Sequence, residues 1–124
     1  MPPPCGPEDL RRFLSSPPAW LTIVADPRPA LAETESLDPG EASVITLAWQ
    51  QRDSSLLIID EKQGRRVSLE LGIRITGTAG VLTDAASEGF VDFEATFQRL
   101  ARTKFRLKSS VIDALRKRLE QRKR

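Results

Sequence analysis

A run of four apolar residues that ends in two acids constrains this chain more than any other feature of its sequence. Leu56 to Ile59 are continuous rather than alternating, and Asp60 and Glu61 follow directly. A short continuous apolar run predicts a strand that is covered on both faces, as in a parallel sheet. Because ligands bind outside the carboxyl ends of such strands, we expect Asp60 and Glu61 at the edge of a cleft.

The rest of the chain predicts strands that alternate with helices. Short strands are expected at residues 20–24 and 73–76, and a short helix that Pro7 opens is expected in the proline-rich segment 1–19. The remaining helices are expected after Asp38 (well buried), from about Glu61 to Leu71, before Gly89, after Asp92 and from near Ser110. This alternation predicts an α/β fold with a parallel sheet.

Composition excludes several chemistries. The 124 residues contain no histidine and one cysteine, Cys5, so catalytic triads with histidine, zinc sites built from histidine or thiolates and iron–sulfur clusters are excluded. Catalysis would rest on carboxylates, hydroxyls, lysine, arginine or a hard metal ion. The lone cysteine, the absence of an apolar signal region and the lack of an apolar run near the roughly 18 residues that span a bilayer predict a cytoplasmic protein with no membrane partner.

Charge is divided unequally along the sequence. Residues 1–62 contain five basic and ten acidic residues, whereas residues 63–124 contain fourteen basic and seven acidic residues. An acidic half and a basic half suit metal coordination on one side and phosphate attraction on the other. The alternative is that the C-terminal helix is basic only because it is solvated, and the terminal RKRLEQRKR fits that interpretation.

The acids of the first half are candidates for a metal site. Glu41 near a helix N-terminus and Asp60 at a strand C-terminus come from different elements of one sheet edge. Both can converge on a divalent ion that binds oxygen ligands and lowers the pKa of a bound water. Two structural alternatives stay open: Glu41 closes a capping box with Asp38, and Asp60 caps the helix that follows it.

Three further side chains are candidates for contact with a phosphate. Thr76 and Thr78 follow a short strand, and Arg65 lies one turn into the helix after the acids. The alternatives are that the threonines cap a helix and that the arginine is an ordinary surface residue.

Together these motifs resemble the PIN-domain family. LDPGEASVITLA, LLIIDEKQGRR and LGIRITGTAGVL occur in that order, and EGFVDFEATFQRLARTKFRLKSSVIDALRKR is similar to the C-terminal helices of a branch of small prokaryotic proteins related to VapC toxins. The resemblance extends from about Trp20 to Arg118. It implies a three-layer α/β/α domain over residues 20–124 with a parallel sheet, and a nuclease that acts on RNA with Mg²⁺ or Mn²⁺.

The resemblance also assigns roles to residues. It places the glutamate of the family's GEA motif at Glu41 and the acid that closes the central strand at Asp60, which makes these two residues catalytic. Glu61 matches a neighbouring acid, so the implied metal ligands are Glu41, Asp60 and Glu61. Arg65, Thr76 and Thr78 are the expected substrate contacts. An antitoxin protein and a homodimer are the expected protein partners.

The chain departs from the family pattern at its N-terminal side. The family's first strand, which ends in a catalytic aspartate, and the helix after it have no counterpart in these residues. A truncated gene, a misplaced start codon or a partner that supplies the strand would each explain this. We therefore expect an impaired ribonuclease, with a non-catalytic module that binds RNA or a protein as the alternative.

Overall fold

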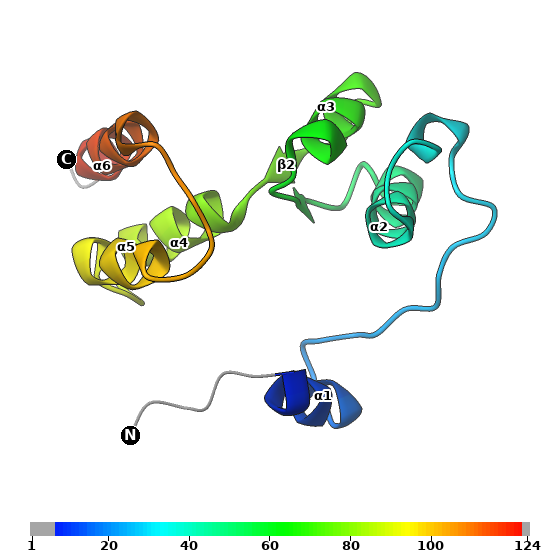
Figure 1. The fold of residues 1–124 in the computed structure, drawn as a ribbon, viewed down its shortest axis with the longest axis horizontal. Helices are drawn as coiled ribbons and strands as arrows, with labels where there is room; N and C mark the ends of the chain where they lie inside the picture. Colours follow the sequence, from blue (N-terminus) through cyan, green and yellow to red (C-terminus); the bar gives the residue numbers. More distant parts are fainter. Residues whose placement is uncertain (1–6, 123–124) are drawn as a thin grey trace.

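The computed structural model describes residues 7–122. Over that range the chain is mostly helical, with two short strands (Figure 1). The elements are α1 (Pro7–Ser15), the short 3₁₀ helix η1 (Ala32–Thr34), α2 (Pro39–Gln50), β1 (Leu57–Ile58), α3 (Lys62–Glu70), β2 (Ile75–Thr76), α4 (Thr78–Ser87), α5 (Phe93–Ala101) and α6 (Ser109–Arg122). The predicted order of helices from α2 to α6 is confirmed.

The two strands form a parallel pair, as the sequence predicts. Leu57 lies opposite Ile75, and the backbone N–H of Ile59 donates to the carbonyl oxygen of Thr76 at 2.8 Å. Both strands are shorter than the predicted runs. The fold is therefore α/β with a small parallel sheet, which confirms the predicted fold class.

One face of β1 is buried and the other is exposed. Leu57 and Ile59 pack against Ile45 and Ala48 of α2 in the first hydrophobic core. The side chains that alternate with them, Leu56 and Ile58, point the other way and are each 57% exposed. The prediction of a strand covered on both faces is wrong over the described residues, because this core covers only the face of β1 that carries Leu57 and Ile59.

Helix α2 likewise buries one side rather than its whole circumference. Ala42, Ile45 and Thr46 are buried, whereas Val44 is 39% exposed. The hydroxyl of Thr46 donates to the carbonyl oxygen of Ala42 at 2.7 Å and accepts from the backbone N–H of Leu31 at 3.0 Å. This buried hydroxyl fixes the segment around η1 against α2.

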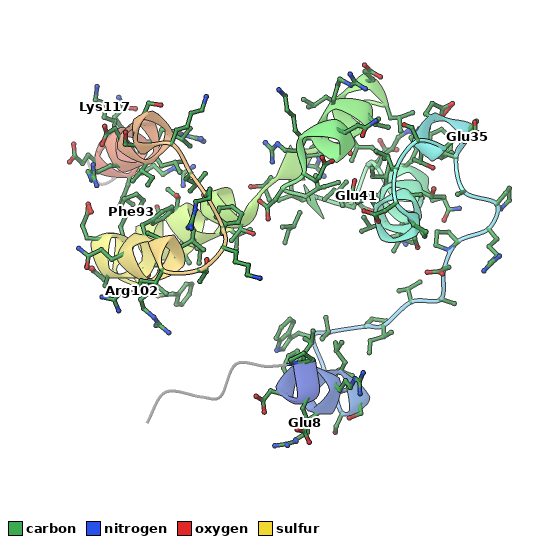
Figure 2. All side chains as sticks on the ribbon, in the orientation of Figure 1. Glu8, Glu35, Glu41, Phe93, Arg102 and Lys117 are labelled. Carbon is green, nitrogen blue, oxygen red and sulfur yellow. The ribbon has the colours of Figure 1, made fainter. Side chains whose placement is uncertain are left out.

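A second core holds the last three helices together. Ala86 of α4, Phe93 and Phe97 of α5, and Leu115 and Leu119 of α6 are all buried in it, and the rings of Phe93 and Phe97 stack with centroids 4.4 Å apart. Figure 2 shows Phe93 among the side chains between these helices. The C-terminal helices therefore pack mainly on one another, at one end of the molecule (Figure 1).

Helix ends follow the predicted signals closely. The carboxylates of Asp38 and Asp92 accept backbone N–H groups from the first turns of α2 and α5, each at 2.9 Å. Gly72 and Gly89 end α3 and α4 with φ angles of +75° and +79°, which only glycine adopts without strain. Helix α3 is capped by Glu61, which accepts from the N–H of Gly64, so Asp60 is not its cap.

The N-terminal part differs from the prediction. Helix α1 forms where Pro7 predicts it, but none of its residues is buried (Figure 1). The strand predicted at residues 20–24 is wrong, because these residues belong to no strand or helix and a strand requires a neighbouring strand. The first six residues of the predicted proline-rich segment lie outside the described range, and the division of the chain at residue 19 stays a prediction.

Candidate active site

The predicted site residues lie at the carboxyl edge of the sheet. Asp60 and Glu61 lie two and three residues after the end of β1, and Thr76 is the last residue of β2. Glu41 comes from the first turn of α2 (Figure 2). Acids and hydroxyls from separate segments of the chain therefore lie in one region, because the strands end there and the helices begin there.

Glu41 and Glu61 are brought together over Gly64. The carboxylate of Glu61 accepts from the backbone N–H of Gly64 at 2.9 Å, and a Cβ atom on Gly64 would lie 2.9 Å from Oε2 of Glu41. Partial burial raises the pKa of Glu41 to about 7, and contact with the carboxyl groups of Asp38 and Glu61 adds to that rise. Hydrogen bonding from the Glu41 N–H lowers the pKa of Asp38.

The raised pKa has a direct chemical meaning. A carboxyl group beside other carboxyl groups keeps its proton to a higher pH, and once the proton is lost neighbouring carboxylates can bind one cation together. Carboxylate oxygens are the ligands that Mg²⁺ and Mn²⁺ prefer. The donor set of Glu41 and Glu61 therefore fits a hard divalent ion.

Asp60 belongs to a different cluster. Its two carboxylate oxygens accept from the backbone N–H of Thr78 at 2.8 Å and from the hydroxyl of Thr78 at 2.6 Å. This position at the first turn of α4 is favourable for a negative charge because the helix dipole is positive there. Asp60 thus fastens the end of β1 to the start of α4.

Arg65 adjoins the same cluster. Its Nη1 donates to the carbonyl oxygen of Ile59 at 2.8 Å. A Cβ atom on Gly77 would lie 2.7 Å from Oδ1 of Asp60 and 3.0 Å from Nη1 of Arg65, so both side chains close over that glycine. The hydroxyl of Thr76 lies against Gly80 in the same region.

The structure therefore divides the predicted residues into two groups. Glu41 and Glu61 form one, and Asp60, Arg65 and Thr78 form the other. Between residues 7 and 122, no group of three or more aspartates, glutamates, histidines or cysteines is arranged to hold a metal ion. The three predicted metal ligands are near one sheet edge but are not gathered around one point.

A cleft of about 520 Å³ opens beside Asp60. Its wall includes three of the predicted residues, Asp60, Arg65 and Thr76. The opposite wall comes from the loop after α5 and from α6, and it contributes Phe105, Arg106, Arg118 and Arg122. Arginines thus outnumber the two acids that line the cleft, one of which, Asp84, is paired with Arg122 at 2.6 Å.

Sequence reasoning missed this wall. Phe105 and Arg106 lie in a loop that contains no recognisable motif. They line the same cleft as Asp60 because α6, which follows this loop, packs on α4. Arg118 and Arg122 belong to the basic C-terminal run that is interpreted from sequence as a solvated end. The excess of basic residues in the second half of the chain was the one signal that pointed to them.

Comparison with known families agrees with the fold and the sheet edge. The family model described as PIN domain matches residues 7–121. This match spans nearly the whole sequence, so the chain belongs to the PIN-domain family. No curated protein and no solved structure matches the chain.

Membership defines the general class of the protein. PIN domains are nuclease-like modules that commonly bind RNA and generally depend on divalent metal ions. Among the helices of residues 7–122, none has the length and apolar character that a membrane span requires.

Proposed function

We propose that this protein is a metal-dependent endoribonuclease of low activity, with its site at the carboxyl edge of the β1–β2 sheet. The observation that carries the proposal is the pair of carboxyl groups of Glu41 and Glu61 over Gly64. Two acids held in contact fit a shared Mg²⁺ or Mn²⁺, and the family is generally dependent on divalent metal. Asp60 is the third acid of the proposed site.

Each acid has a separate role in the proposal. A bound divalent ion would supply positive charge that stabilises the negative charge on the phosphate oxygens and would lower the pKa of a water. Glu41 and Glu61 would hold that ion after Glu41 loses its proton. Asp60 would contribute negative charge at the edge of the cleft and would position α4 through Thr78.

The substrate side of the proposal rests on the arginine-lined cleft. A single RNA strand carries one negative charge per phosphate, and arginine binds phosphate through a planar pair of N–H groups. The guanidinium of Arg65 lies with Asp60 over Gly77, the hydroxyl of Thr76 lines the same cleft, and the hydroxyl of Thr78 lies on Asp60. We propose that Arg65, Thr76 and Thr78 contact the phosphate next to the cleaved bond.

A second candidate function, a non-catalytic module that binds RNA or a protein, is favoured by one observation. Both oxygens of Asp60 are already satisfied by Thr78, so this acid is arranged for structure rather than for an ion. The basic cleft does not depend on that acid for its attraction to phosphates. This candidate predicts binding of RNA without turnover.

The biological setting is also part of the proposal. The resemblance of the GEA and LLIID motifs to VapC-related proteins supports a prokaryotic toxin–antitoxin role, with a cytoplasmic location and an antitoxin protein as partner. The absence of a third metal-ligating side chain beside Glu41 and Glu61 within residues 7–122 supports the low activity. A second copy of this chain is a further proposed partner.

Cleavage of a mixed-sequence RNA in Mn²⁺ tests the enzymatic proposal. We expect slow cleavage that a chelator abolishes and that falls at least about tenfold in Glu41→Gln, because the lost carboxylate is a proposed ligand. Asp53→Asn, a change at an exposed residue of the turn before β1, is the matched control and should cleave normally. Binding without cleavage by the folded protein would favour the second candidate.

A further inference from the structure

Helix α1 exposes an apolar face that nothing in residues 7–122 covers. Leu10, Phe13 and Leu14 are 58%, 46% and 39% exposed, and no residue of α1 is buried. Charged residues, among them Glu8, occupy the rest of its surface. In Figures 1 and 2 this helix lies apart from the other helices. An amphipathic helix is stable only when its apolar face is buried against something.

The segment after α1 has the same property. Trp20, Ile23 and Val24 are 78%, 60% and 53% exposed, and residues 20–24 belong to no strand or helix. The sequence WLTIV is rich in the aromatic and β-branched residues that favour strands. We call α1 and residues 20–24 the donor segment.

Strand β1 has a matching surface. Only β2 pairs with β1 in the described part of the chain, and the N–H groups of Leu57 and Ile59 both point to β2. The backbone groups of Ile58 therefore point to the opposite edge, because they alternate along a strand. The side chains of Leu56 and Ile58 are more than half exposed on the face away from α2. We call this edge and face the acceptor.

From these surfaces we propose that two copies of the chain form a reciprocal dimer, in which the donor segment of each copy covers the acceptor of the other. Residues 20–24 would pair along the open edge of β1, and α1 would pack on Leu56 and Ile58. An edge strand that is left open is the usual template for such pairing.

A second copy is the occupant that fits these observations best. Each chain contains one donor segment and one acceptor, so a twofold pair satisfies both at once and leaves no further site for growth. Phe13 and Trp20 alone expose roughly 200–300 Å². The exposed aliphatic side chains of the two surfaces bring the total towards the ~800 Å² per partner that a stable interface buries.

The chain's own contacts keep the donor segment away from its own acceptor. The hydroxyl of Ser43 donates to Oδ1 of Asp26 at 2.9 Å, only two residues after Val24. The N–H of Leu31 donates to Thr46 at 3.0 Å, and both serine and threonine belong to α2. These bonds fix the chain after the donor segment to α2, and the donor segment leads away from β1 (Figure 1).

Sedimentation equilibrium of the full chain tests the proposal. We expect a dimer whose dissociation constant rises about tenfold or more in Ile23→Lys and in Ile58→Lys, because either change buries a charge without a partner. Phe90→Lys is the matched control: Phe90 is 79% exposed after α4, outside both surfaces, and should dimerise normally. A monomer at all concentrations, or a dimer insensitive to both lysines, would overturn the proposal.

Mixing the two lysine variants tests the exchange itself. The Ile58→Lys chain has an intact donor segment and the Ile23→Lys chain has an intact acceptor, so one donor–acceptor contact is restored in a heterodimer and the mixture should associate more tightly than either variant alone. Recovery also shows that both variants are folded. Failure to recover while circular dichroism shows native helix content would contradict the exchange.

A disulfide distinguishes a second copy from the chain's own acceptor. In a chain with Cys5→Ser, Ile23→Cys and Ile58→Cys, oxidation should give a covalent dimer on a non-reducing gel. A cross-linked monomer as the main product would mean that the donor segment folds back within one chain, and the proposal would be wrong.

Discussion

Gly64 lies beneath two carboxyl groups, and its missing side chain is what allows them to meet. A Cβ atom there would lie 2.9 Å from Oε2 of Glu41 and 2.6 Å from Cδ1 of Ile59. Both distances are shorter than van der Waals contact. The close approach of α2 to the start of α3 therefore depends on this glycine.

The first prediction is that Gly64→Ala lowers the free energy of unfolding by about 1–3 kcal/mol, because the added methyl group displaces Ile59 and Glu41. Urea denaturation measures the change. Gly40→Ala is the matched control, since its Cβ atom would meet only Oδ1 of Asp38, at 3.4 Å. Equal stability of the two variants would show that the acids do not pack over Gly64.

The second prediction concerns the proton on Glu41. Its pKa is about 7 in the folded chain and near 4.5 in the unfolded chain. Between these values the folded state binds more protons, so the free energy of unfolding should fall as pH rises from 4.5 to 7. Glu41→Gln should flatten this fall and be more stable than the natural chain at pH 8, in buffer that contains a chelator.

Denaturation at pH 5, 6, 7 and 8 measures both slopes. Glu35→Gln is a suitable control because Glu35 is an exposed glutamate beside η1. A fall of the same size in Glu41→Gln would assign the titration to another group.

Orientation was the part of the site that sequence reasoning could not provide. The motifs predicted that Glu41, Asp60 and Glu61 would share one sheet edge, and they do. Adjacent residues after a strand point in different directions, however, so Glu61 turns to Gly64 whereas Asp60 turns to Thr78. Which way each side chain turns depends on where α3 and α4 begin in space, and no local motif gives that.

At the scale of the elements, caps were the most informative sequence signals. Asp38 and Asp92 each precede a helix and each accepts a first-turn N–H, as predicted. The same reasoning failed at residues 20–24, because a strand is stabilised by a neighbouring strand that local sequence does not specify. The prediction of a strand covered on both faces at residues 56–59 is wrong for a related reason: apolar residues do not reveal whether a second layer covers them.

The third prediction tests a cap. Asp92→Ala should lower the free energy of unfolding by about 1 kcal/mol, because the Ala95 N–H loses its acceptor at the start of α5. Thermal denaturation at constant pH measures the loss. Asp53→Ala, in the exposed turn before β1, should leave the transition unchanged. A similar loss in both variants would point to net charge rather than to the cap.

At the scale of the whole molecule, two hydrophobic cores meet at the cleft. The first core fixes the acids after β1, and the second fixes α6, which carries Arg118 and Arg122 to the other wall. The cleft therefore brings Asp60 of the acidic half of the sequence opposite arginines of the basic half, which the charge distribution alone does not specify.

The fourth prediction follows from that arrangement. RNA binding should weaken as salt rises, and Arg118→Ala should reduce the slope of log affinity against log salt by about 0.7, the value for one single-strand phosphate contact. Fluorescence anisotropy with a labelled RNA measures both. Arg99→Ala, an exposed change on α5 outside the cleft, should keep the full slope. Equal slopes would place the RNA elsewhere.

Calorimetric titration of the full chain with Mn²⁺ at pH 8 tests the central claim most directly, because it does not depend on turnover. The account predicts one ion per chain, with affinity at least about tenfold weaker in Glu41→Gln and in Glu61→Gln and unchanged in Glu35→Gln. It also predicts weaker binding at pH 6, where Glu41 holds its proton. Binding that is absent, or identical in all of these variants, would contradict a metal site at Glu41 and Glu61.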